Sequence, residues 1–412
     1  MVAEILAVGT ELLMGQIANT NAQYLSRRLA DLGIRVLWHS VVGDNPGRLK
    51  ESLALALARA DVVVTTGGLG PTQDDLTKET IAEAFGLDMI CNEAVLGQIE
   101  AFFRKTGRMM VESNRKQAWL PAGSLLVPNP NGTAPGCIIG RDGKTVVMLP
   151  GPPKEMNPMF EETVFPHFER LTGQVLASRM LRVFGIGESM MEARILDLVD
   201  AQTNPTIAPY VGDGDVIVRV TAAAATRPEA EALLAPTVEA IGARLGADLY
   251  TTDNQSMEEV VGRLLLERNL KVSTAESCTG GLIAARLVNV SGISRVFERG
   301  YVVYANRAKE EELGVRAETL ERFGAVSRET AEEMVRGLAG KTGCDVAIAV
   351  TGIAGPEGGT EEKPVGLVHL AVLTPEGLRS REIRLNGNRE RIRTMTALHA
   401  LDMVRRMLLG LP

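Results

Sequence analysis

Two potential nucleophiles, Ser277 and Cys278, stand side by side where a short apolar segment meets a pair of glycines. The stretch reads KVSTAESCTGG, which is typical of a strand that turns tightly into a helix. Because glycine lets the backbone approach a ligand closely, Gly280 is a candidate binding residue. Backbone N–H groups at the start of a helix favour developing negative charge. The stretch therefore predicts acyl transfer, in which a nucleophile attacks a carbonyl carbon and backbone donors stabilise the oxyanion.

The same stretch also has a purely structural interpretation. Serine and threonine are common helix caps, and glycine pairs are common in turns. Taken by itself, the stretch fits a capped helix better than a catalytic site, since such caps are ordinary features of helices. The catalytic interpretation needs further evidence, above all a base that could activate the serine.

The composition of the chain argues against several classes of protein. A chain of 412 residues exceeds one typical core, which predicts two or three domains. No apolar run approaches the roughly 20 residues of a membrane span. The first residues lack the basic start of a signal peptide, so we expect a cytoplasmic protein without a membrane partner. A net charge of −7 disfavours broad nucleic-acid binding, and four scattered cysteines disfavour a zinc site or a disulfide framework.

Strand and helix patterns alternate at both ends of the chain. Near the N-terminus, strand-like runs occupy residues 3–8, 34–42, 61–66 and 145–149. In the C-terminal part, strand-like runs occupy residues 272–274, 300–304, 345–351, 365–373 and 379–385, and a helix is expected from residue 280. Alternation of this kind predicts parallel sheets with right-handed crossovers, in which ligands bind at the carboxyl ends of the strands.

A smaller α+β segment lies between these two ends and carries no polar constellation that suggests chemistry. We therefore expect an α/β protein of three domains. They are a parallel-sheet domain at 1–172, a small α+β connecting domain at 173–252 and a second α/β domain at 253–412. A polar run, TTDNQ, marks the second boundary.

Glycine-rich turns in the N-terminal domain could hold a phosphate beside a cation. The segment TGGLGPTQDDLT follows a buried strand, and the amides of Gly67, Gly68 and Gly70 are candidate phosphate contacts. Asp74 and Asp75 are candidate ligands of a hard divalent cation. The plain alternative is a glycine turn followed by acidic residues in the first turn of a helix, which is favourable by itself.

Three further segments of this domain lie at predicted strand ends. They are GTELLMG, NGTAPG and LPGPPKE, which begin at positions 9, 131 and 149. The first contributes Thr10 and Glu11 as binding candidates. The last contributes Lys154 as a phosphate contact and Glu155 as a further candidate metal ligand. Together with the glycine-rich turn, these segments predict one pocket at the edge of the sheet.

The motifs, taken in order, resemble a known family. GTELLMG, TGGLGPTQDDLT, NGTAPG and LPGPPKEM resemble the molybdopterin-binding fold of MogA and MoaB in its competence/damage-inducible protein A (CinA) form. AESCTGG, ERGYVVYANRAK, GAVS, TGIAGPEGG and GNRERIR resemble the C-terminal nicotinamide-nucleotide amidase domain of the same family. A single glycine-rich piece is weak evidence, whereas the ordered set is specific and covers nearly the whole chain.

For the C-terminal domain, the resemblance implies a serine–lysine amidohydrolase that needs no cofactor. Ser277 would be the nucleophile and Lys309 its base, which requires that burial or nearby cations lower the lysine pKa. Without the resemblance, Lys309 in the context AKEE fits a solvated residue better. Tyr304 would relay a proton or hold the ligand. The implied substrate contacts are Thr279, Gly280, Thr351, Gly352, Gly355, Arg389 and Arg393.

For the N-terminal domain, the resemblance implies a metal-dependent ADP-ribose pyrophosphatase that uses Mg²⁺ or a similar divalent cation. Two alternatives stay open. One is binding or transfer of molybdopterin without hydrolysis. The other is a non-enzymatic factor in competence or DNA repair, which the acidic charge disfavours. The expected partners are small-molecule nucleotides and a second copy of the chain in a homodimer, and nucleic acid is disfavoured.

Overall fold

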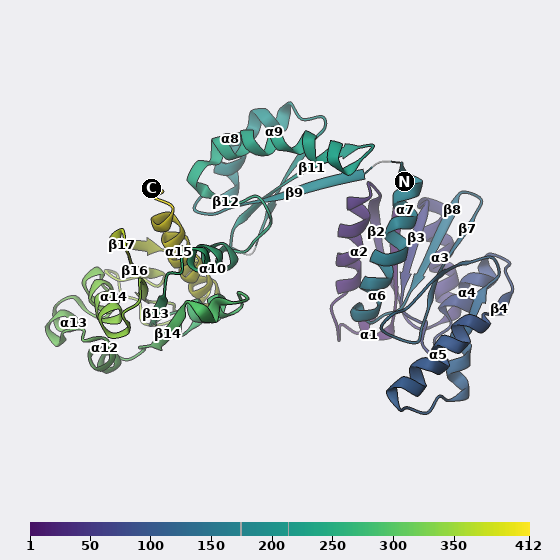
Figure 1. Cartoon of the computed structure of the whole chain (residues 1–412), viewed down its shortest axis with the longest axis horizontal. Coiled ribbons are helices and arrows are strands. Elements are labelled where there is room, and N and C mark those ends of the chain that lie inside the picture. Colours follow the sequence, from purple (N-terminus) through teal and green to yellow (C-terminus); the bar gives the residue numbers. More distant parts are fainter. Residues whose placement is uncertain (174, 213) are drawn as a thin grey trace. The chain divides into compact units, whose positions relative to one another are not determined.

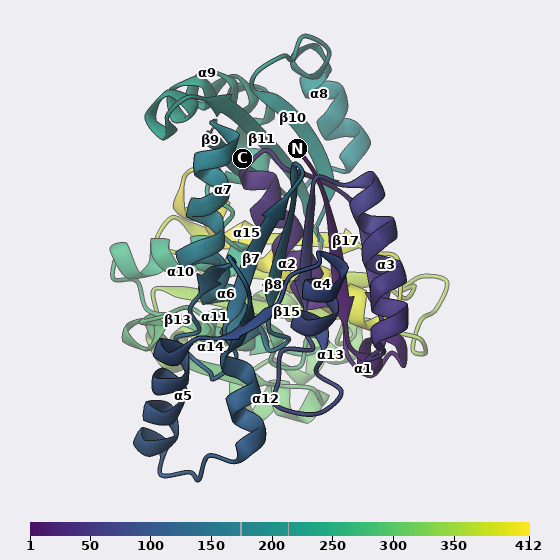
Figure 2. The same cartoon turned by 90° about the vertical axis from the view of Figure 1, so that its right-hand side faces the viewer.

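The computed structural model describes residues 1–173, 175–212 and 214–412. The chain forms two compact units, which comprise residues 1–177 with 222–232 and residues 178–221 with 233–412. Figure 1 and Figure 2 show that helices and sheets are layered within each unit. In the described ranges, no helix is both long enough and apolar enough to cross a membrane.

A six-stranded sheet forms the centre of the N-terminal unit. In spatial order its strands are β2 (Arg35–Val42), β1 (Val2–Val8), β3 (Val62–Thr66), β8 (Lys144–Leu149), β7 (Gly136–Arg141) and β6 (Leu125–Val127). The first four are parallel, whereas β7 and β6 run antiparallel to their neighbours. The expected α/β class is confirmed, with an antiparallel edge on an otherwise parallel sheet.

Helices cover both faces of this sheet (Figure 1). One face packs against α2 (Thr20–Asp31), α6 (Pro153–Met159) and α7 (Phe165–Thr172). The other face packs against α3 (Pro46–Arg59), α4 (Thr77–Ala84) and α5 (Glu93–Thr106). Three of these helices start after an asparagine whose side chain accepts a backbone N–H three residues on, which stabilises the helix start. The capping residues are Asn19, Asn45 and Asn92.

Smaller elements complete the N-terminal unit. They are α1 (Thr10–Leu13), the two-stranded ribbon of β4 (Met89–Cys91) and β5 (Trp119–Pro121), and the turns η1 (Glu112–Ala118) and η2 (Phe160–Val164). Lys78 and Lys116 hold η1 against the loop before α4, since Lys78 Nζ donates to Gln117 O and Lys116 Nζ donates to Thr72 O. This tie fixes the loop that carries the predicted metal ligands.

A four-stranded sheet and two helices form the α+β segment that follows. In spatial order the strands are β10 (Thr206–Val211), β11 (Val216–Ala224), β9 (Val175–Val183) and β12 (Leu249–Thr251). The helices are α8 (Glu188–Asp200) and α9 (Arg227–Leu245), and the short turn η3 (Gly246–Asp248) leads into β12. Strands β10 and β11 pair antiparallel, as do β12 and β9.

Five strands form the sheet of the C-terminal part. In spatial order they are β14 (Phe297–Val302), β13 (Val272–Glu276), β15 (Val346–Gly352), β16 (Leu367–Thr374) and β17 (Gly377–Arg384). The first three are parallel, while β16 and β17 are antiparallel. Both faces are covered, which explains why the central strand β15 is an almost unbroken apolar run.

One face of this sheet packs against α10, α11 and α15, and the other against α12, α13 and α14. Their bounds are α10 (Met257–Glu267), α11 (Leu282–Val288), α12 (Asn306–Leu313), α13 (Ala317–Phe323), α14 (Arg328–Thr342) and α15 (Arg389–Leu408), with a short turn η4 (Ile293–Arg295) before β14. The sequence-based helix start at residue 280 is wrong. Gly280 and Gly281 both adopt positive φ values, of 60° and 92°, which an α-helix excludes.

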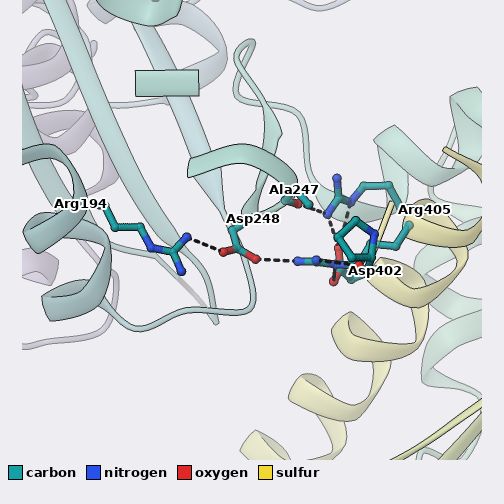
Figure 3. A network of polar contacts seen from close by, with 7 residues as sticks. Arg194, Ala247, Asp248, Asp402 and Arg405 are labelled. Atoms are coloured by element: carbon teal, nitrogen blue, oxygen red, sulfur yellow. Dashed lines mark hydrogen bonds and ion pairs between the residues drawn. The ribbon is translucent and has the colours of Figure 1, made fainter. Parts of the chain in front are cut away.

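A buried ion-pair network joins the end of α15 to the segment before β12 (Figure 3). Asp402 and Arg405 are each only 2% exposed. Arg405 donates to Asp402 Oδ1 from Nε at 2.9 Å and from Nη2 at 2.6 Å, while Arg406 Nε donates to Asp402 Oδ2 at 2.7 Å. The whole network comprises Arg194, Ala247, Asp248, Asp402, Arg405, Arg406 and Pro412. A buried cation of this kind depends on its counter-charge.

Replacement of Asp402 by Asn should destabilise α15 by about 3 kcal/mol or more, because Arg405 would remain as a buried cation without its counter-charge. Hydrogen exchange of the α15 amides in the full chain measures this loss of protection. The control is Glu311→Gln, which removes the exposed ion pair that Arg307 and Glu311 form at 2.7 Å. We expect little change there, since exposed pairs contribute little. Equal protection in the two variants would contradict the prediction.

Candidate active site

Two parallel strands of the C-terminal sheet end side by side and carry the predicted nucleophile. Ser277 follows β13, and its N–H donates to Val350 O on β15 at 3.1 Å. The ladder between the strands therefore continues for one more residue, which places Ser277 level with Thr351. Side chains alternate along a strand, so both residues point to the face covered by α12 to α14, as Ala275 and Ala349 do. This edge is where parallel sheets bind ligands.

Lys309 reaches Ser277 from helix α12. Its side chain is 1% exposed, and Nζ lies 3.2 Å from Ser277 Oγ. The same nitrogen donates to Val303 O at 2.9 Å and to Tyr304 O at 3.2 Å. Burial lowers the pKa of Lys309 from the ordinary lysine value. In the neutral amine the two carbonyls can take both N–H groups, which leaves the nitrogen lone pair for the proton of Ser277.

The turn after Ser277 is closed by its own backbone. Gly280 N–H donates to Ser277 O at 3.1 Å, and Gly280 and Gly281 take left-handed φ values that suit glycine. In the described ranges, no backbone carbonyl accepts the N–H groups of Cys278 and Thr279. These two amides are therefore the free donors nearest to Ser277, whereas the helix start that the sequence suggested lies further on, at Leu282.

Cys278 is the second potential nucleophile, and its surroundings disfavour it. The thiol is buried in the apolar cluster beneath α11 and α15. Burial raises the pKa of Cys278 to about 12. The thiolate, which is the reactive form of cysteine, is therefore scarce near neutral pH. Between the two neighbouring residues, the geometry favours Ser277 as the nucleophile because it alone is hydrogen-bonded to a base.

Two arginines of α15 reach the loops around this site. Arg393 donates to Thr279 O from Nε at 3.2 Å and from Nη2 at 2.7 Å. Arg389, one turn earlier on the same face, donates to Gly355 O at 2.7 Å and to the Tyr304 hydroxyl at 3.0 Å. From one helix, the two predicted binding residues therefore support two segments. Arg393 holds residues 277–281, which we call the catalytic turn, and Arg389 holds the glycine-rich loop between β15 and β16.

The structure gives the other predicted residues of this domain distinct surroundings. Tyr304 lies beyond the end of β14 at Val302, and its side chain is 59% exposed. The sequence-based strand end at 304 is therefore wrong. The Thr351 hydroxyl donates to Ala325 O at 2.7 Å, which leaves its oxygen lone pairs to accept from a ligand. Gly352 ends β15.

A cavity of about 310 Å³ lies at the carboxyl ends of the parallel strands in the N-terminal unit. Its lining includes Glu11, Asn21, Thr66 and Gly151. Gly67 follows Thr66 at the same edge of the sheet. A Cβ at this position would lie 2.0 Å from Val8 O, so the close approach of the two backbones requires glycine. Among the residues predicted to bind here, Glu11 lines this cavity. The predicted residue Thr10 instead donates its N–H and its hydroxyl to Asp44, at 2.9 and 2.8 Å.

The predicted metal ligands lie on two loops of this unit. Asp75 Oδ2 accepts the N–H and the hydroxyl of Thr72, and a Cβ on Gly70 would lie 2.4 Å from the same oxygen. Asp74 is exposed. Within the described ranges, no group of three or more His, Cys, Asp or Glu side chains is placed to hold an ion. A divalent cation at this loop would have Asp74 and Asp75 as its candidate carboxylate ligands, and ligand phosphates and water would have to complete its shell.

The other two predicted residues, Lys154 and Glu155, lie in the first turn of α6. Glu155 Oε2 accepts from Asn129 Nδ2 at 2.6 Å. Lys154 is exposed, and its carbonyl accepts from Asn131. In the described ranges, no hydrogen bond or ion pair joins Glu155 to either aspartate. Gly68, the remaining predicted phosphate contact, is packed against Thr77, because a Cβ there would lie 2.1 Å from its hydroxyl oxygen.

Comparisons with known proteins account for the chain from end to end. The family model described as CinA C-terminal domain matches residues 254–408, and that of a probable molybdopterin binding domain matches 4–170. The model of the damage-inducible protein CinA KH domain matches 178–251. A putative competence-damage inducible protein of Acetivibrio thermocellus is 56% identical over 411 residues, which covers 100% of both chains. The chain belongs to the CinA family.

Further CinA relatives include a CinA-like protein of Dictyoglomus turgidum, which is 52% identical over 411 residues and 100% of both chains. Among solved structures, the competence/damage inducible protein CihA from Agrobacterium tumefaciens is 46% identical. That match covers 37% of this chain and 96% of CihA, with a TM-score of 0.36.

The sequence analysis misses two residues of these CinA sites. Glu276 ends β13 and is fully buried beside Ser277. Asn21 lines the N-terminal cavity, donates to Gly151 O at 2.7 Å and leaves Oδ1 without a partner in the described ranges. The sequence does contain a signal for Glu276. It is a glutamate at the end of a strand, followed by a helix whose N-cap residue, Gly281, has no side chain to cap it. Asn21 carries no such signal, since an asparagine near a helix start is ordinary.

The state of the thiol gives a direct test of the catalytic turn. With iodoacetamide at pH 8, the native protein should be modified at Cys91, which is partly exposed, and Cys278 should stay unmodified because its thiol is buried and protonated. Mass spectrometry of the peptides measures both sites, and the urea-unfolded protein, in which both should react, is the control. Modification of Cys278 at the rate of Cys91 in the native protein would contradict this description.

Proposed function

We propose that the C-terminal domain is a serine–lysine amidohydrolase that converts nicotinamide mononucleotide into nicotinate mononucleotide and ammonia. The observation that carries the proposal is the 3.2 Å contact between Lys309 Nζ and Ser277 Oγ inside a buried site. A serine hydroxyl becomes nucleophilic when an adjacent base takes its proton. Membership of the CinA family and the resemblance of the motifs to an amidase domain support this substrate.

The proposed reaction begins when Ser277 Oγ attacks the carboxamide carbon and its proton passes to Lys309. The N–H groups of Cys278 and Thr279 are the candidate donors to the resulting oxyanion. The C–N bond then breaks, and Lys309 returns the proton to the leaving ammonia. Water then attacks the acyl-enzyme and gives its proton to Lys309. The C–O bond to Ser277 breaks to release the acid, and Lys309 returns that proton to Ser277 Oγ. Lys309 is suited to both steps because burial lowers its pKa and raises the neutral fraction.

Ammonia release from nicotinamide mononucleotide tests this proposal in the full chain. We expect Ser277→Ala and Lys309→Met each to lower kcat at least about a thousandfold, because one removes the nucleophile and the other the base. Cys278→Ala is the matched control and should change kcat little, since its thiol is protonated and packed in the core. Wild-type turnover in Ser277→Ala, or its loss in Cys278→Ala alone, would overturn the assignment.

We further propose that the N-terminal domain hydrolyses ADP-ribose to AMP and ribose 5-phosphate with a divalent cation. Water would attack one phosphorus atom and the bridging P–O bond would break. Asp74 and Asp75 would hold the cation, which would supply Lewis-acid activation of the phosphoryl group. The support is the cavity at the carboxyl ends of the strands and the neighbouring glycine-rich loop with Asp74 and Asp75. The match to a molybdopterin-binding model favours a second candidate, which is pterin binding without hydrolysis.

Substitution of the two aspartates separates these candidates. Asp74→Asn and Asp75→Asn should each lower Mg²⁺-dependent AMP release by roughly tenfold to a hundredfold, the range for disturbing the surroundings of a bound metal. Asp142→Asn, on an exposed turn, is the control. A chain that releases no AMP and binds molybdopterin more tightly than ADP-ribose in calorimetric titration would support the second candidate.

A homodimer is also part of the proposal, and sedimentation at the mass of one chain would contradict it.

A further inference from the structure

Glu276 is the last residue of β13 and precedes the proposed nucleophile. Its side chain is 0% exposed. The carboxylate accepts two backbone N–H groups from the start of α11, from Ile283 to Oε2 at 3.0 Å and from Ala284 to Oε1 at 2.9 Å. In the described ranges, no lysine, arginine or histidine forms an ion pair with it. The charge is therefore held by the positive end of a helix and not by a cation.

These two bonds close the catalytic turn. Helix α11 has Gly281 at its cap position, and glycine has no side chain to accept the first N–H groups of the helix. Glu276, on the strand before the turn, accepts two of them instead. Residues 277–282 are thereby held at both ends, while Gly280 N–H ties the turn to Ser277 O. Arg393 holds the same turn at Thr279 O. The direction in which Ser277 presents its hydroxyl to Lys309 depends on all three ties.

We propose that Glu276 is a positioning residue of the amidase site, which sets the catalytic turn so that Ser277 meets Lys309 and the amides of Cys278 and Thr279 stay free. The inference rests on the proposed function of that site. A carboxylate is required because it can accept both helix N–H groups at once. Glutamine has one acceptor oxygen, and its amide group would face the second N–H, which leaves a buried donor unpaired.

The helix start is consequently closed to the substrate. A helix N-terminus normally attracts anions, but here the N–H groups of Ile283 and Ala284 are already taken by Glu276. The oxyanion would therefore be stabilised by the turn itself, through the N–H groups of Cys278 and Thr279, which donate to no backbone carbonyl in the described ranges. The carboxylate also adds to the burial that raises the pKa of Cys278 to about 12, which keeps the neighbouring thiol protonated. One side chain thus favours Ser277 over Cys278 in two ways.

The test uses the full chain and compares Glu276→Gln with Glu276→Asp. We expect both variants to lower kcat for nicotinamide mononucleotide by roughly a hundredfold with KM little changed, as for a misplaced catalytic group. Aspartate keeps the charge, but its shorter side chain cannot accept both N–H groups. Wild-type kcat in Glu276→Gln, or in Glu276→Asp, would overturn the positioning by two hydrogen bonds.

The matched control is Glu259→Gln, which alters the start of α10, a helix on the same face of the sheet as α11. Glu259 Oε2 accepts Ser256 N–H at 2.6 Å in the capping box of α10, away from the catalytic turn. This variant should keep kcat and KM. A fall in kcat equal to that of Glu276→Gln would show a general loss of folding and overturn the inference.

A second readout does not depend on turnover. Opening of the turn should make Cys278 react with iodoacetamide faster in Glu276→Gln and Glu276→Asp, and not in Glu259→Gln. If the wild type releases no ammonia, the proposed function fails, and this reaction still decides whether Glu276 holds the turn. Unchanged protection of Cys278 in both Glu276 variants would overturn the inference. If Glu276→Gln does not fold, as judged by circular dichroism, Glu276→Asp carries both readouts.

Discussion

The burial of one amine organises the C-terminal site. In the part of the chain that the structure describes, Lys309 is buried without an ion pair, and its nitrogen is hydrogen-bonded to neutral acceptors. Two of them are consecutive carbonyls, at Val303 and Tyr304, which are available only because β14 has ended and the chain has not yet entered α12. The third is the hydroxyl of Ser277. Removing the amine from water thus lowers its pKa and raises the neutral fraction, while the two carbonyls orient the nitrogen toward Ser277.

The remaining features of the site keep that arrangement in place. Ser277 is fixed by a ladder bond to Val350, and the turn behind it is fixed by Glu276 and by Arg393. The contacts with Val350 and Arg393 join segments that are far apart in the chain, whereas those of Glu276 reach seven and eight residues along it. The catalytic geometry is therefore a property of the folded sheet and its helices, which place a short and glycine-rich turn that has little rigidity of its own.

Much of the architecture could be predicted because buried strands and amphipathic helices leave clear periodic patterns. The α/β class and the strands around 3–8, 61–66 and 345–351 follow directly from such patterns. Strand direction did not follow, since an apolar run such as β16 looks alike in parallel and antiparallel sheets. The contact of Lys309 with Ser277 came from family resemblance, because AKEE looks solvated locally. The role of Glu276 could not be predicted from periodicity, because its hydrogen bonds to the amides of Ile283 and Ala284 depend on how the turn between them folds.

Helix α15 has a consequence for how such proteins can be recombined. Its first turns hold the turn after Ser277 through Arg393 and the loop at Gly355 through Arg389, and its last turns form the buried network with Asp248 and Ala247. Twenty residues span about 30 Å, so one stiff rod serves both ends. A chimera that joins this C-terminal part to another relative's middle segment would therefore have to transplant the acceptors of Arg405 and Arg406 together with the rod. The contacts between these two segments therefore include that network as well as the linker between them.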